Sequence, residues 1–336
     1  LMLLDYILFA LLPILGVSYG DPFLPWIVFA FLRLFLWIVF VGVLLLVKRP
    51  NLLLLARRIY WGIHIVLLIA ILDGAYLEPQ ILTVSHVRLE TSALPAGTSL
   101  KVVQLSDLHI ERTTNRERKI PALVESLQPD IIVLTGDYLN LSYLDDPGAI
   151  ADARSLLAQM HAPWGVFAVN GSVDSPERMQ QLFDGLDIRV LSNEAIAIPV
   201  ANSEITLIGL EDDEGWYFNQ TIAALEKIMT GQSKDQFQLL LYHNPDLMEN
   251  AALDGVDLYL TGHTHGGQVR LPFYGAAVTF SAFGKKYEMG RYDINGMTLY
   301  VSRGVGLEGS FAPRVRFLCP PEVVLIEIVG IGSSAK

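Results

Sequence analysis

Hydrophobic residues are distributed unevenly along this chain. Residues 26–47 form an almost unbroken apolar run that contains one charged side chain, Arg33. Residues 59–77 form a second apolar run, and residues 6–19 form a third, which is shorter and contains a proline. A helix needs roughly 20 apolar residues to cross the hydrocarbon core of a membrane. We therefore expect residues 1–78 to form a transmembrane helical anchor with two to three spans.

Two other interpretations explain this apolar region less well. Core helices of a soluble protein rarely cluster at one end of a chain, and a cleaved signal peptide would account only for the first run. Within a span, Arg33 is costly unless it is paired or faces a polar interior. Asp73 is one candidate partner. The alternative is that Arg33 snorkels toward the membrane surface.

Basic residues predict the orientation of the anchor. The connection between the two longer runs carries four of them: Lys48, Arg49, Arg57 and Arg58. After this connection the next Lys or Arg is Arg88. Short cytoplasmic loops are enriched in Lys and Arg. We therefore expect residues 48–58 to be a cytoplasmic loop and the chain after Glu78 to lie outside the cytoplasm.

From Leu100 onward, short β-rich runs alternate with amphipathic stretches. Five apolar runs predict buried strands, at residues 101–105, 130–134, 165–169, 237–241 and 258–260. Residues 120–127 have helical spacing, with Pro121 suited to the first turn of a helix. Residues 111–119 are polar and predict a solvated loop. The pattern indicates an α/β domain over residues 79–336.

Four of the predicted strands are followed by motifs rich in aspartate and histidine. These motifs are Asp107-Leu108-His109, Gly136-Asp137, Tyr242-His243-Asn244 and Gly262-His263-Thr264-His265. Open α/β sheets gather their functional sites at the carboxyl ends of strands. Each motif alone is weak: Gly-Asp is usually a turn, and a single histidine is usually a core residue. Together, two carboxylates and four imidazoles are roughly what two adjacent divalent ions need, which predicts metal-assisted phosphoester chemistry.

At this point the sequence resembles the calcineurin-like metallophosphoesterase family, and more narrowly its membrane-anchored bacterial branch. The resemblance covers about residues 100–328, with close matches at residues 105–109 and 262–268. The matching residues of the tail are Arg303, Gly304, Val305, Gly306, Arg314, Arg316, Pro320, Pro321 and Glu322. The resemblance implies a four-layer α/β/β/α sandwich, in which two mixed sheets pack face to face.

The resemblance also implies which residues bind metal. Asp107, His109 and His265 would hold a first divalent ion. His243 and His263 would hold a second one. Histidine and aspartate ligands suit Mn²⁺, Fe or Zn²⁺ better than Ca²⁺, so we expect two ions of this class.

In the same family pattern, Asp137 bridges the two ions. A hydroxide shared by the ions would attack phosphorus, and the ions would stabilise the charge on the phosphoryl oxygens. Asp137 and His265 are the catalytic residues that the resemblance implies.

One motif of the family is altered in this chain. Where the family has Gly-Asn-His-Asp, this chain has Gly171-Ser172-Val173-Asp174, so a weaker ligand, Ser172, replaces asparagine and Val173 replaces the catalytic histidine. Valine cannot donate a proton. Asn170 could supply the missing amide oxygen, and Asp174 could support a ligand, but a turn role is the simpler interpretation of both.

The leading hypothesis is therefore a membrane-anchored, metal-dependent phosphohydrolase. The anchor favours a phospholipid, a lipid-linked diphosphate or another cell-envelope substrate. Trp216, Tyr217 and Phe218 could form an apolar lip for a lipid, or an aromatic cluster beneath a loop. The alternative hypothesis is a degenerate member of the family that acts as a metal- or ligand-binding regulatory protein.

Charge and cysteine content exclude other classes. The chain beyond residue 78 carries 31 acidic and 19 basic residues, so we expect no nucleic-acid partner. Cys319 is the only cysteine, so no intrachain disulfide can form. A transporter would need more spans and would leave the metal motifs without a role.

Overall fold

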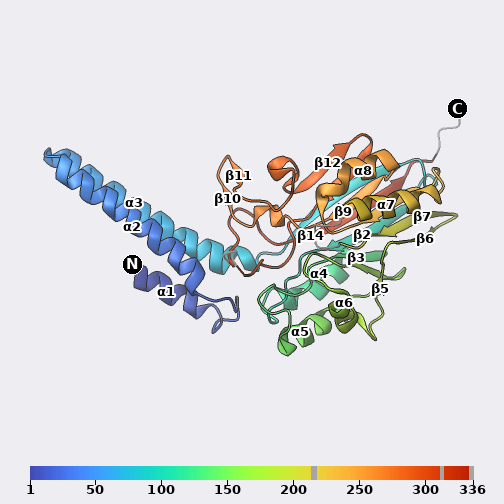
Figure 1. Cartoon of the computed structure of the whole chain (residues 1–336), viewed down its shortest axis with the longest axis horizontal. Coiled ribbons are helices and arrows are strands. Elements are labelled where there is room, and N and C mark those ends of the chain that lie inside the picture. Colours follow the sequence, from blue (N-terminus) through green and yellow to red (C-terminus); the bar gives the residue numbers. More distant parts are fainter. Residues whose placement is uncertain (213–217, 311–313, 333–336) are drawn as a thin grey trace.

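The computed structural model combines a helical hairpin with an α/β sandwich (Figure 1). The structure describes residues 1–212, 218–310 and 314–332. Helix α2 (Phe23–Leu46) runs away from the sandwich and α3 (Pro50–Leu72) returns to it, while the shorter α1 (Met2–Leu11) packs beside α2. A π-helical turn (Asp73–Leu77) and a 3-10 turn (Glu78–Gln80) extend α3 into the sandwich.

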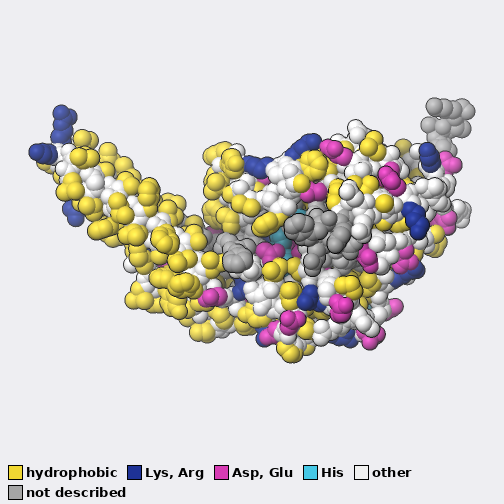
Figure 2. Space-filling view, in the orientation of Figure 1, with side chains coloured by type: hydrophobic (Ala, Val, Ile, Leu, Met, Phe, Trp, Pro, Cys, Tyr) yellow, Lys and Arg dark blue, Asp and Glu magenta, His cyan; other side chains and the backbone are white. Residues whose placement is uncertain are grey.

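Among the described residues, two helices are long and apolar enough to cross a membrane. They are α2 and the continuous helix from Pro50 to Gln80, and both expose nearly all of their apolar side chains. Figure 2 shows this hydrophobic surface along the hairpin, with Lys and Arg side chains at its far tip. The two longer apolar runs of the sequence thus correspond to α2 and α3.

The basic connection between these helices is shorter than the predicted loop 48–58. Helix α3 begins at Pro50, so Arg57 and Arg58 are helical and exposed. Proline favours the first turn of a helix because that position needs no backbone N–H. Lys48 and Arg49 remain in the turn at the tip.

Arg33 is paired, but its predicted partner was wrong. Its guanidinium donates to both carboxylate oxygens of Asp5 on α1, one of them at 2.8 Å, and to Nδ1 of His64 on α3 at 2.7 Å. All three side chains are buried. Asp73 lies nine residues beyond His64, which is about 14 Å further along a helix, so it sits at a different level of the bundle.

Two six-stranded sheets form the sandwich. The first has the order β1-β14-β2-β3-β4-β5, with strands β1 (Thr83–Thr91), β14 (Glu322–Gly330), β2 (Ser99–Leu105), β3 (Ile131–Thr135), β4 (Val166–Val169) and β5 (Arg189–Val190). The second has the order β12-β13-β9-β8-β7-β6, with strands β12 (Gly290–Ile294), β13 (Met297–Val301), β9 (Leu258–Thr261), β8 (Phe237–Leu241), β7 (Ser203–Gly209) and β6 (Glu194–Val200). A small hairpin pairs β10 (Arg270–Leu271) with β11 (Gly275–Ala276).

Helices cover the outer face of each sheet. The inner faces share one core that includes Val102, Val133 and Leu239. The outer face of the first sheet packs against α4 (Ile120–Leu127), α5 (Pro147–Leu157) and α6 (Pro176–Phe183). That of the second packs against α7 (Phe218–Thr230) and α8 (Met248–Asp254). This is the expected four-layer α/β/β/α arrangement, and the five predicted strands are confirmed.

The polar segment 111–119 is not the solvated loop that its composition predicted. Arg116 and Glu117 form a buried ion pair, and both carboxylate oxygens of Glu117 are bonded within the segment. Glu111 is also buried and accepts the Ser18 hydroxyl at 2.8 Å. The segment therefore packs against the base of the helical region, where its polar groups find partners that a sequence pattern cannot reveal.

The end of the helical hairpin is fixed to the sandwich. The carboxylate of Glu78 accepts the backbone N–H groups of Leu318, at 2.8 Å, and of Cys319. The carbonyl of Gly74 accepts the N–H of Arg316 at 2.8 Å. These bonds fix the end of the helical hairpin to the tail of the chain, residues 316–319.

Candidate metal centre

The Asp and His motifs occupy sharp turns at the ends of parallel strands. Strands β2 and β3 of the first sheet and β8 and β9 of the second run directly into them. Five of these residues have left-handed backbone conformations, namely Asp107 (φ 49°), His109 (φ 40°), Asp137 (φ 57°), His263 (φ 68°) and His265 (φ 52°). Such φ values are uncommon for residues other than glycine, and they persist only where surrounding contacts enforce them.

Two glycines allow the motifs to approach one another. A Cβ at Gly262 would overlap the side chains of Ser106 and Asp107. A Cβ at Gly136, whose φ is 87°, would lie 2.6 Å from Gly171 and 2.8 Å from Nδ1 of His243. Side chains cannot occupy these positions, so the glycines permit the two sheets to bring their strand ends together.

One half of the centre consists of four buried side chains. The ligand atoms of Asp107, His109, Asp137 and His265 all lie within 4.8 Å of one another. The Nε2 atoms of His109 and His265 are only 3.0 Å apart, and Nε2 of His265 is 3.5 Å from Oδ1 of Asp107. Oδ2 of Asp107 is buried and has no hydrogen-bond partner among the described residues. These donors fit a divalent metal ion, because they converge without saturating one another.

The other half contains the remaining two histidines. Nε2 of His243 is 3.3 Å from Nδ1 of His263 and 3.2 Å from Oδ2 of Asp137. The same Asp137 oxygen lies 3.6 Å from Nε2 of His109, so this carboxylate stands between the two halves. The carbonyl of Thr135 is 2.8 Å from Nδ1 of His243, which leaves Nε2 directed into the centre.

Charges in the centre shift the pKa values of its members strongly. Burial disfavours the ionised form of Asp137, yet His243 and His109 hold the pKa of its carboxyl far below the usual range. Burial would lower the pKa of His243, but Asp137 outweighs burial and raises it well above its usual value. Burial, followed by the proximity of His109, lowers the pKa of His265. Strongly shifted pKa values in a buried cluster beside a cleft are found at functional sites.

In the altered motif, Ser172 reaches the centre, whereas Asn170 does not. Oγ of Ser172 lies 3.3 Å from Nδ1 of His263, so the serine does reach the centre. Val173 lines the cleft above it, and its backbone N–H donates to Asp137 at 3.1 Å. Asn170 does not replace the missing amide ligand, because its side chain bonds both backbone groups of Asp212. Asp174 is more than a turn residue, since it accepts three backbone N–H groups.

Two acidic residues reach the centre that the motifs did not identify. Oε2 of Glu308 is 3.4 Å from Nε2 of His109 and 3.6 Å from Nε2 of His265. Oδ2 of Asp212 accepts the hydroxyl of Ser172 at 3.1 Å. Asp212 follows β7, so its position at a strand end was a usable signal, whereas nothing in the spacing around Glu308 marks it.

The tail of the chain braces the turn of Asp107. The guanidinium of Arg316 is completely buried and donates to the carbonyls of Gly304 and Gly306. Gly306 in turn donates its N–H to the carbonyl of Asp107 at 2.7 Å. The tail residues that resemble the family are thus structural supports of the centre.

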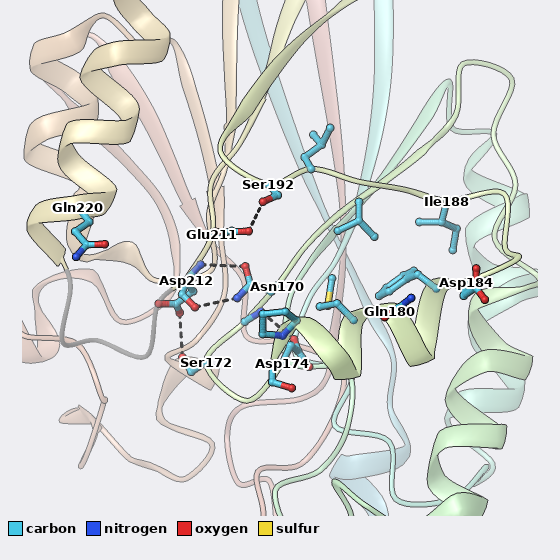
Figure 3. Close-up of a pocket in the computed structure, with 17 residues that line it drawn as sticks. Asn170, Ser172, Asp174, Gln180, Asp184, Ile188, Ser192, Glu211, Asp212 and Gln220 are labelled. Atoms are coloured by element: carbon cyan, nitrogen blue, oxygen red, sulfur yellow. Dashed lines mark hydrogen bonds between the residues drawn. The ribbon is translucent and has the colours of Figure 1, made fainter.

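Two cavities adjoin the centre. A cleft of about 810 Å³ passes over Asp137, Val173, His263 and Glu308 and has Phe280 at its rim. A second pocket of about 790 Å³ has a largely apolar wall, formed by Met179, Phe183, Ile188, Val190 and Leu191, and meets the first at Ser172 and Asp212 (Figure 3). Of the suggested aromatic lip, Trp216 and Tyr217 lie outside the described residues. Phe218 packs partly against the core beneath α7.

Comparison with known proteins places this arrangement in a family. The calcineurin-like phosphoesterase model matches residues 100–267, which include every motif described above except the tail. A metallophosphoesterase of Aquifex aeolicus strain VF5 is 33% identical over 283 residues, which cover 79% of this chain and 99% of the relative. The phosphodiesterase YaeI of Escherichia coli K12 is 32% identical, over 68% of this chain and 82% of the relative.

A more distant relative is named for its substrate. The UDP-2,3-diacylglucosamine pyrophosphatase LpxG of Chlamydia trachomatis is 25% identical over 75% of this chain and 90% of its own length. Both the Aquifex and the Escherichia relatives match more than two thirds of this chain at an identity above 30%. The motifs at the strand ends, the four-layer sandwich and these matches together show that the chain belongs to the calcineurin-like phosphoesterase family.

Proposed function

We propose that this protein is a membrane-anchored hydrolase that cleaves a phosphoester or diphosphate bond with the help of two divalent metal ions. The observation that carries the proposal is the convergence of two aspartates and four histidines at one edge of the sandwich, beneath an open cleft. Membership of a phosphoesterase family supports the class of reaction.

The geometry favours a division of the ligands between two ions. Asp107, His109 and His265 would hold the first, and His243 with His263 would hold the second. Asp137, which faces both histidine pairs, would contact both ions. When bound, Mn²⁺, Fe or Zn²⁺ ions would supply an activated water and stabilise negative charge on the phosphoryl group.

Neighbouring groups keep the proposed metal ligands charged and correctly oriented. The low pKa of Asp137 keeps its carboxylate charged over the whole neutral range. The Thr135 carbonyl orients His243, and the Asp174 carboxylate fixes the backbone of Asp137. Val173 offers no proton to a leaving group, so substrates with good leaving groups, such as diphosphates, suit this site best.

The helical hairpin supports attachment to a membrane. Helix α2 and the helix from Pro50 to Gln80 expose hydrophobic side chains over their whole length. Lys48 and Arg49 lie at the tip furthest from the sandwich (Figures 1 and 2). Because basic residues favour the cytoplasmic side, we propose that the sandwich is extracytoplasmic.

Single-cysteine labelling would test this orientation. The natural Cys319 is buried, so it should remain unlabelled by an impermeant maleimide. The exposed variant Ser126→Cys should react in intact cells whose outer barrier, if any, has been opened. Lys48→Cys should react only after lysis. The reverse pattern would contradict the proposed orientation.

A lipid phosphate or lipid-linked diphosphate is the substrate class that the surface favours. The hairpin of β10 and β11 exposes Leu271, Phe273 and Tyr274, and Val278 and Phe280 follow it. Figure 1 shows the β10–β11 hairpin near the end of the helical hairpin that joins the sandwich, and exposed apolar areas of this kind often contact lipid or a partner. Phe280 also lines the cleft that contains Asp137 and His263, so this apolar area is continuous with the cleft. The diacylated substrate in the name of the Chlamydia relative is of the same class.

One observation favours a second candidate function. The change of the family's Asn-His pair to Ser172-Val173 removes a ligand and a proton donor, which is expected in a regulatory protein that binds a phosphorylated ligand without turnover. The two functions differ in a single measurable property, which is hydrolysis by metal-loaded protein.

A comparison of wild type with Asp137→Ala would decide between them. Both proteins, purified in detergent and loaded with Mn²⁺, are assayed on activated aryl phosphates, phosphodiesters, and lipid phosphates and diphosphates. We expect turnover by wild type and a loss of at least about 10³-fold in the variant, since a bridging ligand serves both ions. Equal inertness, with two ions still bound to wild type, would favour the regulatory function.

A further inference from the structure

The backbone of Asp212 is fixed by two hydrogen bonds to the side chain of Asn170. Its backbone N–H donates to the side-chain oxygen of Asn170 at 3.0 Å, and its carbonyl accepts the Asn170 amide at 2.9 Å (Figure 3). The Asp212 side chain is 4% exposed. The residue before the altered motif thus fixes a buried carboxylate next to that motif.

The carboxylate continues a chain of short contacts that ends in the centre. Oδ2 of Asp212 is 3.1 Å from Oγ of Ser172, which is 3.3 Å from Nδ1 of His263. Nδ1 of His263 is 3.3 Å from Nε2 of His243, which is 3.2 Å from Oδ2 of Asp137. Five atoms that can all ligate a metal therefore follow one another at nearly constant spacing.

This spacing is the one that ligands around a single ion adopt. Two atoms that each lie about 2.1 Å from an ion, at an angle of about 90–110°, are about 3.0–3.4 Å apart. Hydrogen bonds account for single contacts in the series, such as that from the Ser172 hydroxyl to Asp212. The convergence of two imidazole nitrogens, a hydroxyl and two carboxylate oxygens in one series is also the arrangement of donor atoms around a metal ion. Oδ2 of Asp212 stands at the open end of the series.

Glu308 stands in a comparable place at the other half of the centre. Its Oε2 is 3.4 Å and 3.6 Å from the Nε2 atoms of His109 and His265, which are themselves 3.0 Å apart. The three atoms form a triangle of the size expected around one ion. Glu308 also lines the cleft, together with Asp137 and His263.

We propose that Asp212 and Glu308 are additional metal ligands, one for each ion, and that Asp212 takes over the position lost when asparagine became Ser172. This inference rests on the proposed two-metal function and refines it. Asn170, two residues before Ser172, holds the backbone of Asp212 through two hydrogen bonds of its side-chain amide.

With Asp212 and Glu308 as ligands, the centre would carry more negative charge and more carboxylate oxygens. With Asp107 and Asp137 they bring four negative charges, which balance two divalent ions. Carboxylate-rich sites suit hard ions such as Mn²⁺ better than sites built mostly of imidazole or thiolate. Phosphate should therefore bind less tightly here than in a centre with two carboxylates, which favours release of an anionic product.

Mn²⁺ binding to the full-length chain in detergent would test the proposal without any substrate. Stoichiometry is measured by elemental analysis, affinity by calorimetry, and proximity of the two ions by the magnetic coupling of their electron spins. Asp212→Ala should raise the dissociation constant of the second ion by at least about tenfold and abolish the coupled signal. Glu308→Ala should weaken the first ion to a similar extent.

Two further variants make the result specific. Glu211→Ala is the matched control, because Glu211 is next to Asp212 but bonds Ser192 and Asn193. It should bind two ions as wild type does. Ser172→Asn, introduced into Asp212→Ala, should restore the second ion, because an amide oxygen then occupies the position next to His263.

The outcomes separate this inference from the proposed function. Two ions bound by Asp212→Ala with wild-type affinity would overturn the role of Asp212, even if the protein hydrolyses phosphoesters. Similar binding by Asp212→Asn and wild type, with loss in Asp212→Ala, would support ligation through one oxygen. Wild type that binds two ions and hydrolyses nothing would leave the ligand assignment standing and refute the enzyme.

Discussion

The carboxylate of Asp174 accepts the backbone N–H of Asp137 at 2.6 Å, although neither residue is near the other in sequence. The same carboxylate accepts the N–H of Tyr138 at 3.2 Å and that of Gly171 at 2.9 Å. It thereby holds Asp137 in its left-handed conformation, with φ of 57°, and joins the ends of β3 and β4. Asp174 is thus a positioning residue for Asp137, whose carboxylate lies between the two halves of the centre.

Asp174→Ala should therefore weaken both the fold and the activity. Each buried N–H left without an acceptor costs about 1–3 kcal/mol, so thermal unfolding should occur at a clearly lower temperature. Displacement of Asp137 should reduce turnover by about 10–100-fold. Asp184→Ala, at an exposed position close in sequence, is the control. Activity and melting temperature that match this control would show that Asp174 does not position Asp137.

Val173→His should restore a proton donor to the cleft. Val173 is half-buried and borders the cleft beside Asp137 and His263, where a histidine could reach a leaving group. A general acid typically contributes about 10²–10⁴-fold to rate. We expect most of the gain on alkyl phosphates, which have poor leaving groups, and little on activated aryl phosphates. An equal gain on both classes would indicate improved binding of metal or substrate instead.

Metal binding should strengthen as pH rises. In the metal-free protein, Asp137 and Asp107 raise the pKa of His243 in spite of its burial, and Glu308 and Asp137 do the same for His109. Each of these imidazoles must lose a proton before it can ligate. Affinity for Mn²⁺ should therefore fall as pH decreases, by about tenfold per pH unit for each proton released. His265 contributes no such proton, because burial lowers its pKa.

Calorimetry in buffers of different ionisation enthalpy would count these protons. A release of one to two protons per protein is expected near neutral pH. Binding that is independent of pH, with no proton release, would mean that His109 and His243 are already neutral in the metal-free protein.

The sequence was sufficient to predict the site residues that lie just after the ends of buried strands. Asp107, Asp137, His243 and His263 each come shortly after a buried apolar run, and parallel strands bring such positions to one edge. Most side chains of these strands are apolar because both faces of each sheet are covered. Periodicity and position were therefore sufficient to predict this edge of the sandwich.

The position of Glu308 and the burial of Glu111 depend on contacts between segments that are far apart in the sequence, and such contacts cannot be predicted from one sequence. Glu308 reaches the centre because Arg316 and its partners fold the tail back over Asp107. Within the polar segment 111–119, Glu111 is buried where Ser18 and Arg314 meet it. In both cases a polar residue is buried by a tertiary partner, whereas composition alone predicts exposure.

The pairing of Arg33 in the helical hairpin leads to the last prediction. Its guanidinium binds Asp5 and His64, so three helices share one buried polar cluster. Arg33→Leu would leave the Asp5 carboxylate buried without its counter-ion, and the loss of one partner of a buried pair costs about 3–5 kcal/mol. The variant should show earlier thermal loss of helix in detergent.

A double variant and a surface variant make the Arg33 result interpretable. Arg33→Leu combined with Asp5→Leu should regain much of the lost stability, because two apolar side chains replace the pair and no charge remains unpaired. Arg58→Leu removes an exposed charge of the same type and should change the helical melting temperature little. If Arg33→Leu melts at the same temperature as Arg58→Leu, the cluster does not hold α1 against the hairpin. Full-length protein in lipid vesicles should give the same order of stabilities, since the cluster is internal to the three helices and does not depend on the detergent around them.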